Sequence, residues 1–311
     1  MVKKDGVGRA RDGGGNTTTG VLALSSNTAG GSNTAVGFVA LQNNTTASNN
    51  TAIEVGALPN SNTDNNTATG FNALFNNTAG PSNTAYGFSA LSNNNTGGFN
   101  TATGFNALLN NTTGSENIAL GDGAGLAVST ASNVICIGAG VQGENVNNSC
   151  YIGQIFNATA VAGIGVFINS NGKLGTSTSS RRFKEEIKPM DKASEALFAL
   201  KPVTFRYKKD IDLAGTSQFG LVAEEVERVN PDLVACDKEH KPYSVRYDQV
   251  NAMLLNEFLK EHRKVEKLEA LVAQQHKDFE AALADLKGQI QKVSAELELS
   301  KPAPQTVKNT D

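Results

Sequence analysis

The chain has 311 residues, with 27 Lys and Arg against 30 Asp and Glu, but these charges are unevenly placed. Residues 12–172 contain no Lys or Arg, whereas residues 1–150 contain 27 Asn and 19 Thr. A cation-free segment of this length excludes nucleic-acid binding there by phosphate neutralisation, and we expect no nucleic-acid partner.

The sequence lacks the signals of several other protein classes. No apolar run reaches about 18 residues, so we expect no membrane insertion. No apolar segment follows the basic N-terminus, so no signal peptide is visible, and we predict a flexible N-terminus over residues 1–15. The three Cys and three His lack the spacing of a disulfide framework or a metal site, and we infer no cofactor and no metal.

A repeat of 16 or 17 residues occupies residues 16–140. Its pattern is Asn-Thr-Ala-x-Gly-x-x-Ala-Leu, and its first residue falls at Asn16, Asn33, Asn50, Asn66, Asn83, Asn100, Asn117 and Asn133. Short β-prone runs separated by polar turns at this period predict a β-solenoid. We expect two short strands per coil, as at Thr84–Phe88 and around Ala90-Leu91, and a core shared between neighbouring chains because each coil has few large side chains.

The Asn-Thr-Ala-x-Gly-x-x-Ala-Leu coils resemble the left-handed parallel β-roll heads of trimeric autotransporter adhesins and related phage fibres. The resemblance implies a homotrimer. The chain ends in a charged helical segment rather than in the membrane anchor of those adhesins, so we expect a fibre rather than a self-secreting adhesin.

The repeat carries no motif for enzymatic chemistry. Gly121–Gly125 lacks the strand, the helix and the distal acid of a dinucleotide fingerprint, and we interpret it as a turn. The acids of the regular coils, Glu54, Asp64 and Glu116, are isolated from one another, so we infer no sugar-cleaving activity. A receptor on a host cell surface is an expected partner that no motif identifies.

A β-rich transition is expected over residues 141–178, before charged residues return. The following segment, Ser179-Ser180-Arg181-Arg182-Phe183-Lys184-Glu185-Glu186-Ile187, resembles the start of the C-terminal intramolecular chaperone of phage endosialidase tailspikes. The same module occurs in other phage fibres and in the myelin regulatory factor family. Further matches include Lys201–Tyr207, Phe219–Val226 and Val245–Val250, so the resemblance covers about residues 175–265.

This family is implied to trimerise, to assist folding of the upstream fibre and then to cut itself free. The resemblance implies a Ser-Lys dyad with the lysine five residues after the serine, which selects Ser179 and Lys184 as catalytic residues. Ser179 would attack the carbonyl carbon of Thr178 and release residues 179–311. Ser180 stands where the family commonly has an acidic or amide residue, and it is a rival nucleophile by residue type.

The rest of the chain predicts a small α+β domain over residues 179–262. Its expected elements are a helix at Asp191–Leu200, strands at Val203–Tyr207 and Gln218–Val222, and a helix at Ala223–Val229. The first helix is expected to have one apolar face, made of Ala193, Ala196, Leu197 and Leu200. A helix from Asp248 to about Leu299 carries an apolar heptad stripe, which predicts a coiled coil over residues 263–299. Residues 300–311 are predicted to be a disordered tail.

The leading hypothesis is a trimeric fibre or tailspike-like protein whose C-terminal domain is an intramolecular chaperone and a single-turnover serine peptidase. The expected location is a virion tail fibre or a bacterial cell surface. The alternative is a surface adhesin with an inert, non-cleaving trimerisation cap. A regulatory precursor of the myelin-factor kind would need a DNA-binding domain and a membrane span, and the sequence contains neither pattern.

Overall fold

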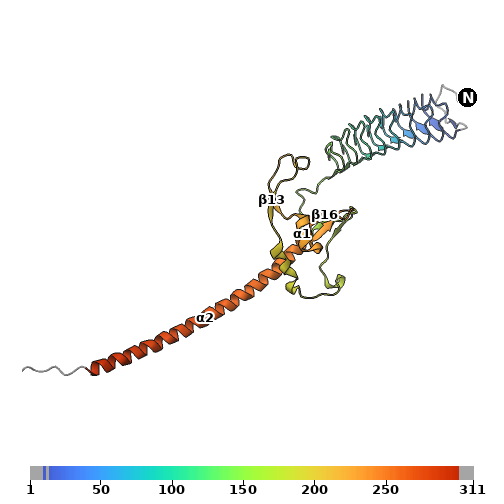
Figure 1. Cartoon of the computed structure of the whole chain (residues 1–311). Helices are drawn as coiled ribbons and strands as arrows, with labels where there is room; N and C mark the ends of the chain where they lie inside the picture. The colour runs from blue at the N-terminus through green and yellow to red at the C-terminus, as the bar shows by residue number, and fades with distance from the viewer. Residues whose placement is uncertain (1–9, 12–13, 301–311) are drawn as a thin grey trace, which may run out of the picture. The chain divides into compact units, whose positions relative to one another are not determined.

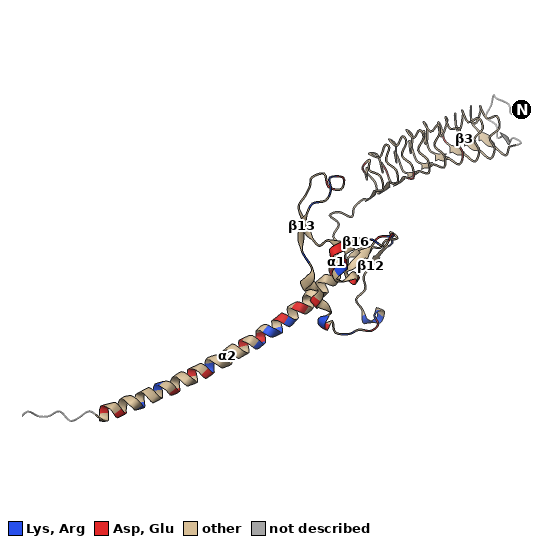
Figure 2. Ribbon diagram, in the orientation of Figure 1, with Lys and Arg blue, Asp and Glu red and all other residues tan. Residues whose placement is uncertain are grey.

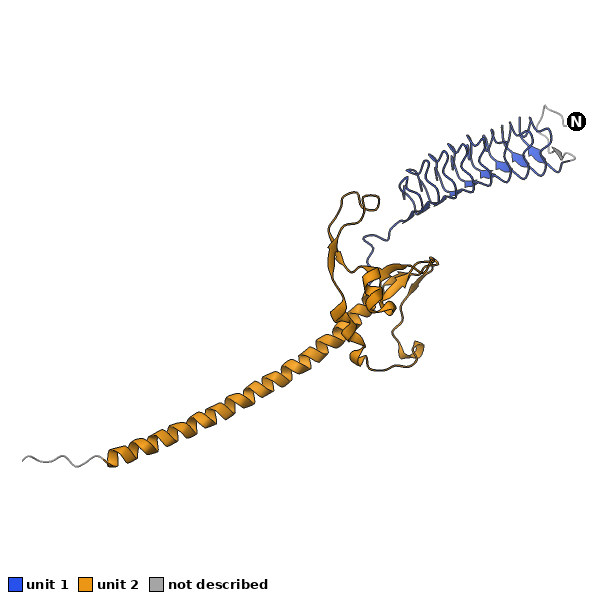
Figure 3. Ribbon diagram, in the orientation of Figure 1, with its two compact units in different colours: residues 1–161 blue, residues 162–311 orange. Residues whose placement is uncertain are grey.

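The computed structural model describes residues 10–11 and 14–300, and the chain divides into two compact units, residues 1–161 and 162–311 (Figures 1 and 3). Residues 301–311 of the tail predicted at 300–311 lie outside the described residues, as does most of the predicted flexible N-terminus. Between residues 14 and 161 the first unit carries no Lys or Arg, and charged residues are numerous in the second unit (Figure 2).

The first unit is a β-solenoid of about eight turns, as the repeat predicts. Its ten-stranded sheet follows the order of the sequence; β1 pairs with β2 antiparallel, and each later pair is parallel. The strands are β1 (Ala10–Arg11), β2 (Thr17–Thr19), β3 (Thr34–Val36), β4 (Thr51–Ile53), β5 (Thr67–Thr69), β6 (Thr84–Tyr86), β7 (Thr101–Thr103), β8 (Ile118–Leu120), β9 (Ile135–Ile137) and β10 (Cys150–Ile152).

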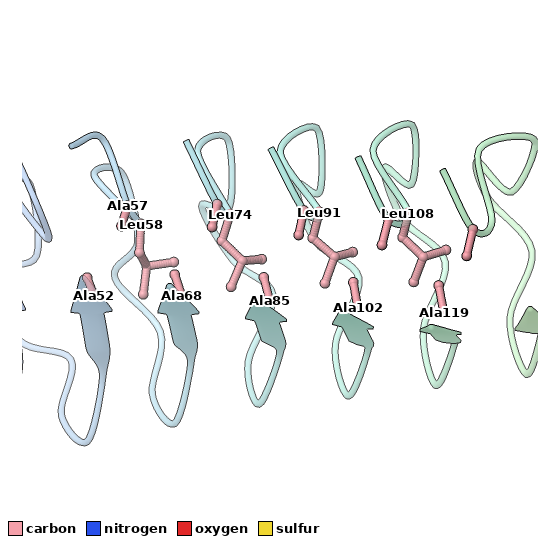
Figure 4. Packing of buried hydrophobic residues seen from close by; sticks show 14 of the residues in the cluster. Ala52, Ala57, Leu58, Ala68, Leu74, Ala85, Leu91, Ala102, Leu108 and Ala119 are labelled. Atoms are coloured by element: carbon pink, nitrogen blue, oxygen red, sulfur yellow. The ribbon is translucent and has the colours of Figure 1, made fainter. Parts of the chain in front are cut away.

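Small side chains fill the interior of each coil. The central Ala of a strand pairs with its counterpart one coil later, as Ala85 does with Ala102, and both are fully buried. Each regular coil adds an Ala-Leu pair to this core, such as Ala90-Leu91, and the Leu points toward the strand Ala (Figure 4). A single chain therefore encloses an apolar core of its own, and the expectation that the coil core is shared between chains is wrong for these residues.

The second strand expected in each coil is absent from the regular coils of the described solenoid. A bend at Gly87 is followed by consecutive turns over residues 88–93, and the Ala90 N–H donates to the Gly87 carbonyl at 3.3 Å. Ser89 and Leu91 both have φ of +53°, a left-handed conformation that a strand does not contain. Contacts between coils persist here, because the Leu91 N–H donates to the Ala107 carbonyl at 3.0 Å.

The glycine that follows each strand is required by both backbone angle and space. Gly87 has φ of +139°, and a Cβ on it would lie 2.3 Å from the carbonyl oxygen of Gly104 in the next coil. Glu54 occupies the equivalent position in one coil with φ of +98°. That coil therefore holds an L-residue in a conformation that glycine tolerates far better.

The anchoring Asn of each repeat forms a buried ladder. In the middle of the solenoid, the side-chain oxygen of Asn83 accepts the backbone N–H of Asn100, and that of Asn100 accepts the N–H of Asn117, both at 3.0 Å. The side-chain amide of Asn100 also donates to the carbonyl of Gly114 at 2.9 Å, which closes the turn of its own coil. One predicted anchor is wrong, since Val134 rather than Asn133 donates to Asn117.

The second unit contains small two-stranded sheets, short helices and one long helix. Its strands are β11 (Val166–Ile168), β12 (Leu174–Thr176), β13 (Val203–Phe205), β14 (Gln218–Gly220), β15 (Val234–Cys236) and β16 (Pro242–Val245), and they pair antiparallel in that order, two by two. Its helices are the 3-10 helices η1 (Arg181–Phe183), η2 (Asp191–Ala199) and η3 (Pro231–Leu233) and the α-helices α1 (Ala223–Val229) and α2 (Tyr247–Leu299).

A small apolar core joins α1, β15, β16 and the first turns of α2. Its buried members are Val226, Leu233, Val234, Val245, Val250 and Met253, and Leu197 and Leu200 from the η2 segment pack against it. The helix predicted at Ala223–Val229 is confirmed, and α2 begins one residue before the predicted Asp248.

The segment after Asp191 differs from the prediction because it is a 3-10 helix. With three residues per turn instead of 3.6, the inward face changes. Three residues of the expected apolar face, Ala196, Leu197 and Leu200, do pack against the core. Ala193 is exposed and Ser194 is fully buried, so the placement of Ala193 on that face is wrong.

Candidate functional site

The sequence-predicted dyad lies on an open segment of the second unit. Ser179 lies three residues after the end of β12, and Lys184 directly follows η1. Both residues are exposed, and so is the neighbouring Ser180, which caps η1 without a side-chain hydrogen bond. The local structure is held by the backbone, since the Lys184 N–H donates to the Arg181 carbonyl at 3.1 Å.

The single chain does not assemble Ser179 and Lys184 into a catalytic pair. No hydrogen bond joins their side chains in the described part of the chain. The Arg182 guanidinium lies over the ring of Phe183, 4.6 Å from its centroid. The chemistry of a Ser-Lys dyad requires a closer approach of the two side chains than this open segment provides.

The open segment belongs to a much longer exposed stretch. Every residue from 154 to 189 is exposed, including large apolar side chains that proteins ordinarily bury: Ile155, Phe156, Val161, Ile164, Val166, Phe167, Ile168, Leu174, Phe183 and Ile187. The β11–β12 hairpin, with a turn at residues 169–172, therefore has no apolar core among the described residues of its own unit. Such contiguous apolar exposure is typical of a surface that another chain covers.

The structure assembles a different serine and lysine, which sequence reasoning missed. Ser194 on η2 is fully buried, and its hydroxyl oxygen lies 3.3 Å from the Nζ of Lys260 on α2. The Asn256 side-chain amide donates to the same hydroxyl at 2.6 Å, and the hydroxyl donates to the Glu257 carboxylate. These contacts span 62 to 66 residues of sequence, so no local motif signals them.

The chemistry of this polar cluster is structural rather than nucleophilic. The Lys260 Nζ lies 2.6 Å from the Glu257 carboxylate, so the amine is already engaged in an ion pair. Lys260 and the Ser194 hydroxyl hold the pKa of Glu257 below its ordinary value. Enclosure of Ser194 also keeps a substrate from its hydroxyl. The cluster therefore fastens η2 to α2.

Helix α2 presents an apolar stripe that nothing in the described chain covers. The stripe consists of Val265, Leu268, Val272, Phe279, Leu283, Leu286, Ile290, Val293 and Leu297, all exposed. Gln275 occupies the remaining position of the seam. A helix of 53 residues with such a stripe is typical of one helix of a coiled coil, in which the stripe packs against partner helices.

Residues 179–235 match the family described as chaperone of endosialidase. The C-terminal unit of this chain contains an endosialidase-type chaperone domain. Its matched region begins at Ser179 and includes Lys184 and Ser194. The domain, together with the β-solenoid before it, fits a phage tail fibre. No curated protein and no solved structure matches the chain.

Two further findings concern the described residues. None of their helices combines the length and apolar character needed to cross a bilayer. No group of three or more His, Cys, Asp or Glu side chains among them is arranged to hold a metal ion.

Proposed function

We propose that the chain is a trimeric fibre protein whose chaperone domain brings three copies together and then cuts itself off between Thr178 and Ser179. The observation that carries this proposal is the start of the chaperone-family match at Ser179, with a lysine five residues later. The exposed apolar stretch before it and the exposed stripe on α2 support a multimer, because both need partner chains to leave water.

Trimerisation from the C-terminal end solves a physical problem of the solenoid. Coils of nearly identical sequence can pair between chains in several registers that differ by one whole repeat. A clamp of three α2 helices aligns the chains before the coils pack. Removal of the chaperone domain afterwards makes unfolding a one-way process, which protects the fibre kinetically.

The proposed cleavage is an acyl transfer within the chain. Neutral Lys184 takes the proton of the Ser179 hydroxyl, whose oxygen attacks the carbonyl carbon of Thr178. The Thr178–Ser179 peptide bond breaks, Lys184 returns the proton to the departing Ser179 amine, and the acyl group remains as an ester on the Ser179 oxygen. Water then hydrolyses the ester, leaving a Thr178 carboxylate and restoring the Ser179 hydroxyl.

The exposure of Lys184 in the single chain connects cleavage to assembly. A lysine serves as a base only in its neutral form, which burial favours. Packing of the open segment against neighbouring copies would bury Lys184 and bring Ser179 within reach. On this proposal, an unassembled chain stays intact and a trimer cuts itself.

A matched pair of substitutions on α2 tests the assembly step. Ile290 lies on the apolar stripe and the adjacent Gln291 lies outside it, and both are exposed in the single chain. Both substitutions are made in a Ser179→Ala background, which keeps the chain whole. Light scattering of the Ser179→Ala protein should give three times the mass of its chain, and adding Gln291→Asp should preserve this value. Adding Ile290→Asp should shift the protein toward monomer. A monomeric Ser179→Ala protein would contradict the proposal.

The non-cleaving structural adhesin is the second candidate function. It is favoured by the open arrangement of Ser179 and Lys184 and by Ser180 at the position that is commonly acidic in the chaperone family. On this alternative the protein still forms trimers, but each chain keeps its full length.

A further inference from the structure

A row of aromatic side chains runs along the outside of the solenoid. Phe71, Phe88 and Phe105 hold the same place in three successive coils, directly after the turn glycine. Neighbouring ring centroids are 5.2 Å apart and the rings are nearly parallel, at 15° and 16°. Each ring is exposed, by 43 to 51%. We call these three residues the phenylalanine row, and Phe38 holds the same place nearer the N-terminus.

The row is rigidly positioned by the backbone. The Phe71 carbonyl accepts the N–H of Ser89 in the next coil, and the Phe88 carbonyl accepts the N–H of Asn106, both at 2.9 Å. Because these backbone hydrogen bonds join each coil to the next, the spacing of the rings is the spacing of the coils. The row therefore forms a regular apolar strip that remains exposed in the single chain.

The chemistry around the row excludes an ionic partner. Residues 65–115 contain no Asp, Glu, Lys or Arg, so the coils that carry the row are neutral. The stacked rings cover the faces that they turn toward one another. A ligand that stacks on ring faces therefore finds fewer faces to bind, whereas a second strip of apolar side chains with the same spacing can pack along the row.

We propose that the phenylalanine row is the surface by which the solenoids of neighbouring copies contact one another and find their register. This proposal rests on the trimeric fibre proposed above. We expect the partner of the row to be a second copy of this chain, because that copy presents an equally neutral strip whose side chains have the same spacing. Copies aligned residue for residue then place each Phe of the row beside its equivalents.

The residues at the ends of the row disfavour pairing in which one copy is displaced by a whole coil relative to another. The equivalent positions before it and after it are Val55 and Asp122. A slip of one coil would place Phe105 against Asp122, which desolvates a carboxylate beside an aromatic ring, and Phe71 against Val55. The row would therefore specify register within the solenoid itself, in addition to the alignment that α2 provides.

Crosslinking of the full chain, kept whole by Ser179→Ala, tests this contact. The exposed Cys150 and Cys236 are first replaced by Ser, and the buried Cys136 is retained. This protein, without any introduced cysteine, measures the background of crosslinking. Phe88→Cys and Phe105→Cys should give severalfold more bismaleimide-linked chains than Phe99→Cys. Phe99 is the matched control because it is exposed on the same coils at a place outside the row.

Two outcomes distinguish failure of the proposed contact at the phenylalanine row from failure of the proposed trimer. A protein that light scattering shows to be trimeric, but that crosslinks at position 99 as well as at 88 and 105, would overturn the contact alone. A monomer would overturn both proposals.

Register is tested by co-expressing Phe88→Cys chains with Phe105→Cys chains. Peptide mapping should find links between equal positions and few links from 88 to 105. Asp122→Phe lengthens the row and should raise the share of 88-to-105 links severalfold. Abundant 88-to-105 links without that substitution, or no increase with it, would overturn the register role.

Discussion

The side-chain oxygen of Asn83 accepts the backbone N–H of Asn100, one coil later, at 3.0 Å. Asn83 is fully buried, so this bond forms away from water and its loss would leave a buried polar group without a partner. The same relationship recurs from Asn16 to Asn117 and explains why Asn anchors the repeat. No apolar side chain of similar size could satisfy the next coil in this way.

A second Asn ladder inside the coils contains a defect that a substitution should repair. Asn94 donates to Asn77 at 2.8 Å, but Ser61 replaces the preceding Asn, and the buried side-chain oxygen of Asn44 has no hydrogen-bond partner. Ser61→Asn can donate to Asn44 and accept from Asn77. We expect it to raise the free energy of unfolding by about 1 kcal/mol, measured by thermal denaturation.

The control for this repair is Ser92→Asn, which adds the same side chain at a half-buried position outside the ladder. We expect it to change stability by less than about 0.5 kcal/mol. Equal effects of the two substitutions would show that ladder completion is not the cause.

Glu54 should be replaceable by glycine with a gain in stability. Its φ of +98° lies outside the conformations that L-residues favour, and other coils have glycine there. Glycine has more conformational freedom in the unfolded chain, which costs free energy on folding. The free energy gained by removing the backbone strain should exceed that cost, so Glu54→Gly should stabilise the solenoid by about 1 kcal/mol. Circular dichroism during heating measures the change.

Glu144→Gly is the matched control for that substitution, because Glu144 is exposed and does not have positive φ. It should leave the midpoint of unfolding unchanged or lower it slightly. A lower midpoint for Glu54→Gly would contradict the interpretation that the Glu54 backbone is strained.

The polar cluster between η2 and α2 should make the chaperone domain sensitive to acid. Its Lys260 and Ser194 hold the pKa of Glu257 below the ordinary value of 4.5. A lowered carboxyl pKa in the folded state adds stability above the ordinary value, and that stability is lost as the pH falls through the folded pKa. Denaturant unfolding over a series of acidic pH values should therefore show a loss that Glu257→Gln lacks.

Glu261→Gln is the control for this titration. Its carboxylate pairs with Lys264 at 3.6 Å, but both side chains are largely exposed, and such pairs contribute little. Its acid profile should follow that of the unmodified protein. Identical profiles for all three proteins would contradict the role given to Glu257.

The solenoid could be predicted from sequence because each coil repeats the same pattern of residue types at a fixed spacing. The turn that replaces the expected second strand could not, because the φ of +53° at Leu91 depends on how the coil closes over its core. Leu is not a residue type that signals a left-handed backbone.

The candidate dyad could be proposed from the sequence because its signal is local. Ser179 and Lys184 lie five residues apart on a segment whose sequence resembles a known family. Ser194 meets Lys260 across 66 residues through the packing of η2 on α2, which the sequence presents as two unrelated helices. The burial of Ser194 in place of Ala193 followed from a change of helix type that no single residue indicates.

The most direct test of self-cleavage is the intact-mass spectrum of the purified protein beside its Ser179→Ala and Ser180→Ala variants. Self-cleavage by Ser179 should give two species for the unmodified protein, one ending at Thr178 and one beginning at Ser179, and the same pair for Ser180→Ala. Ser179→Ala should give one full-length species of 32.5 kDa. A full-length mass for an unmodified protein shown to be trimeric, or cleavage that persists in Ser179→Ala, would contradict the account.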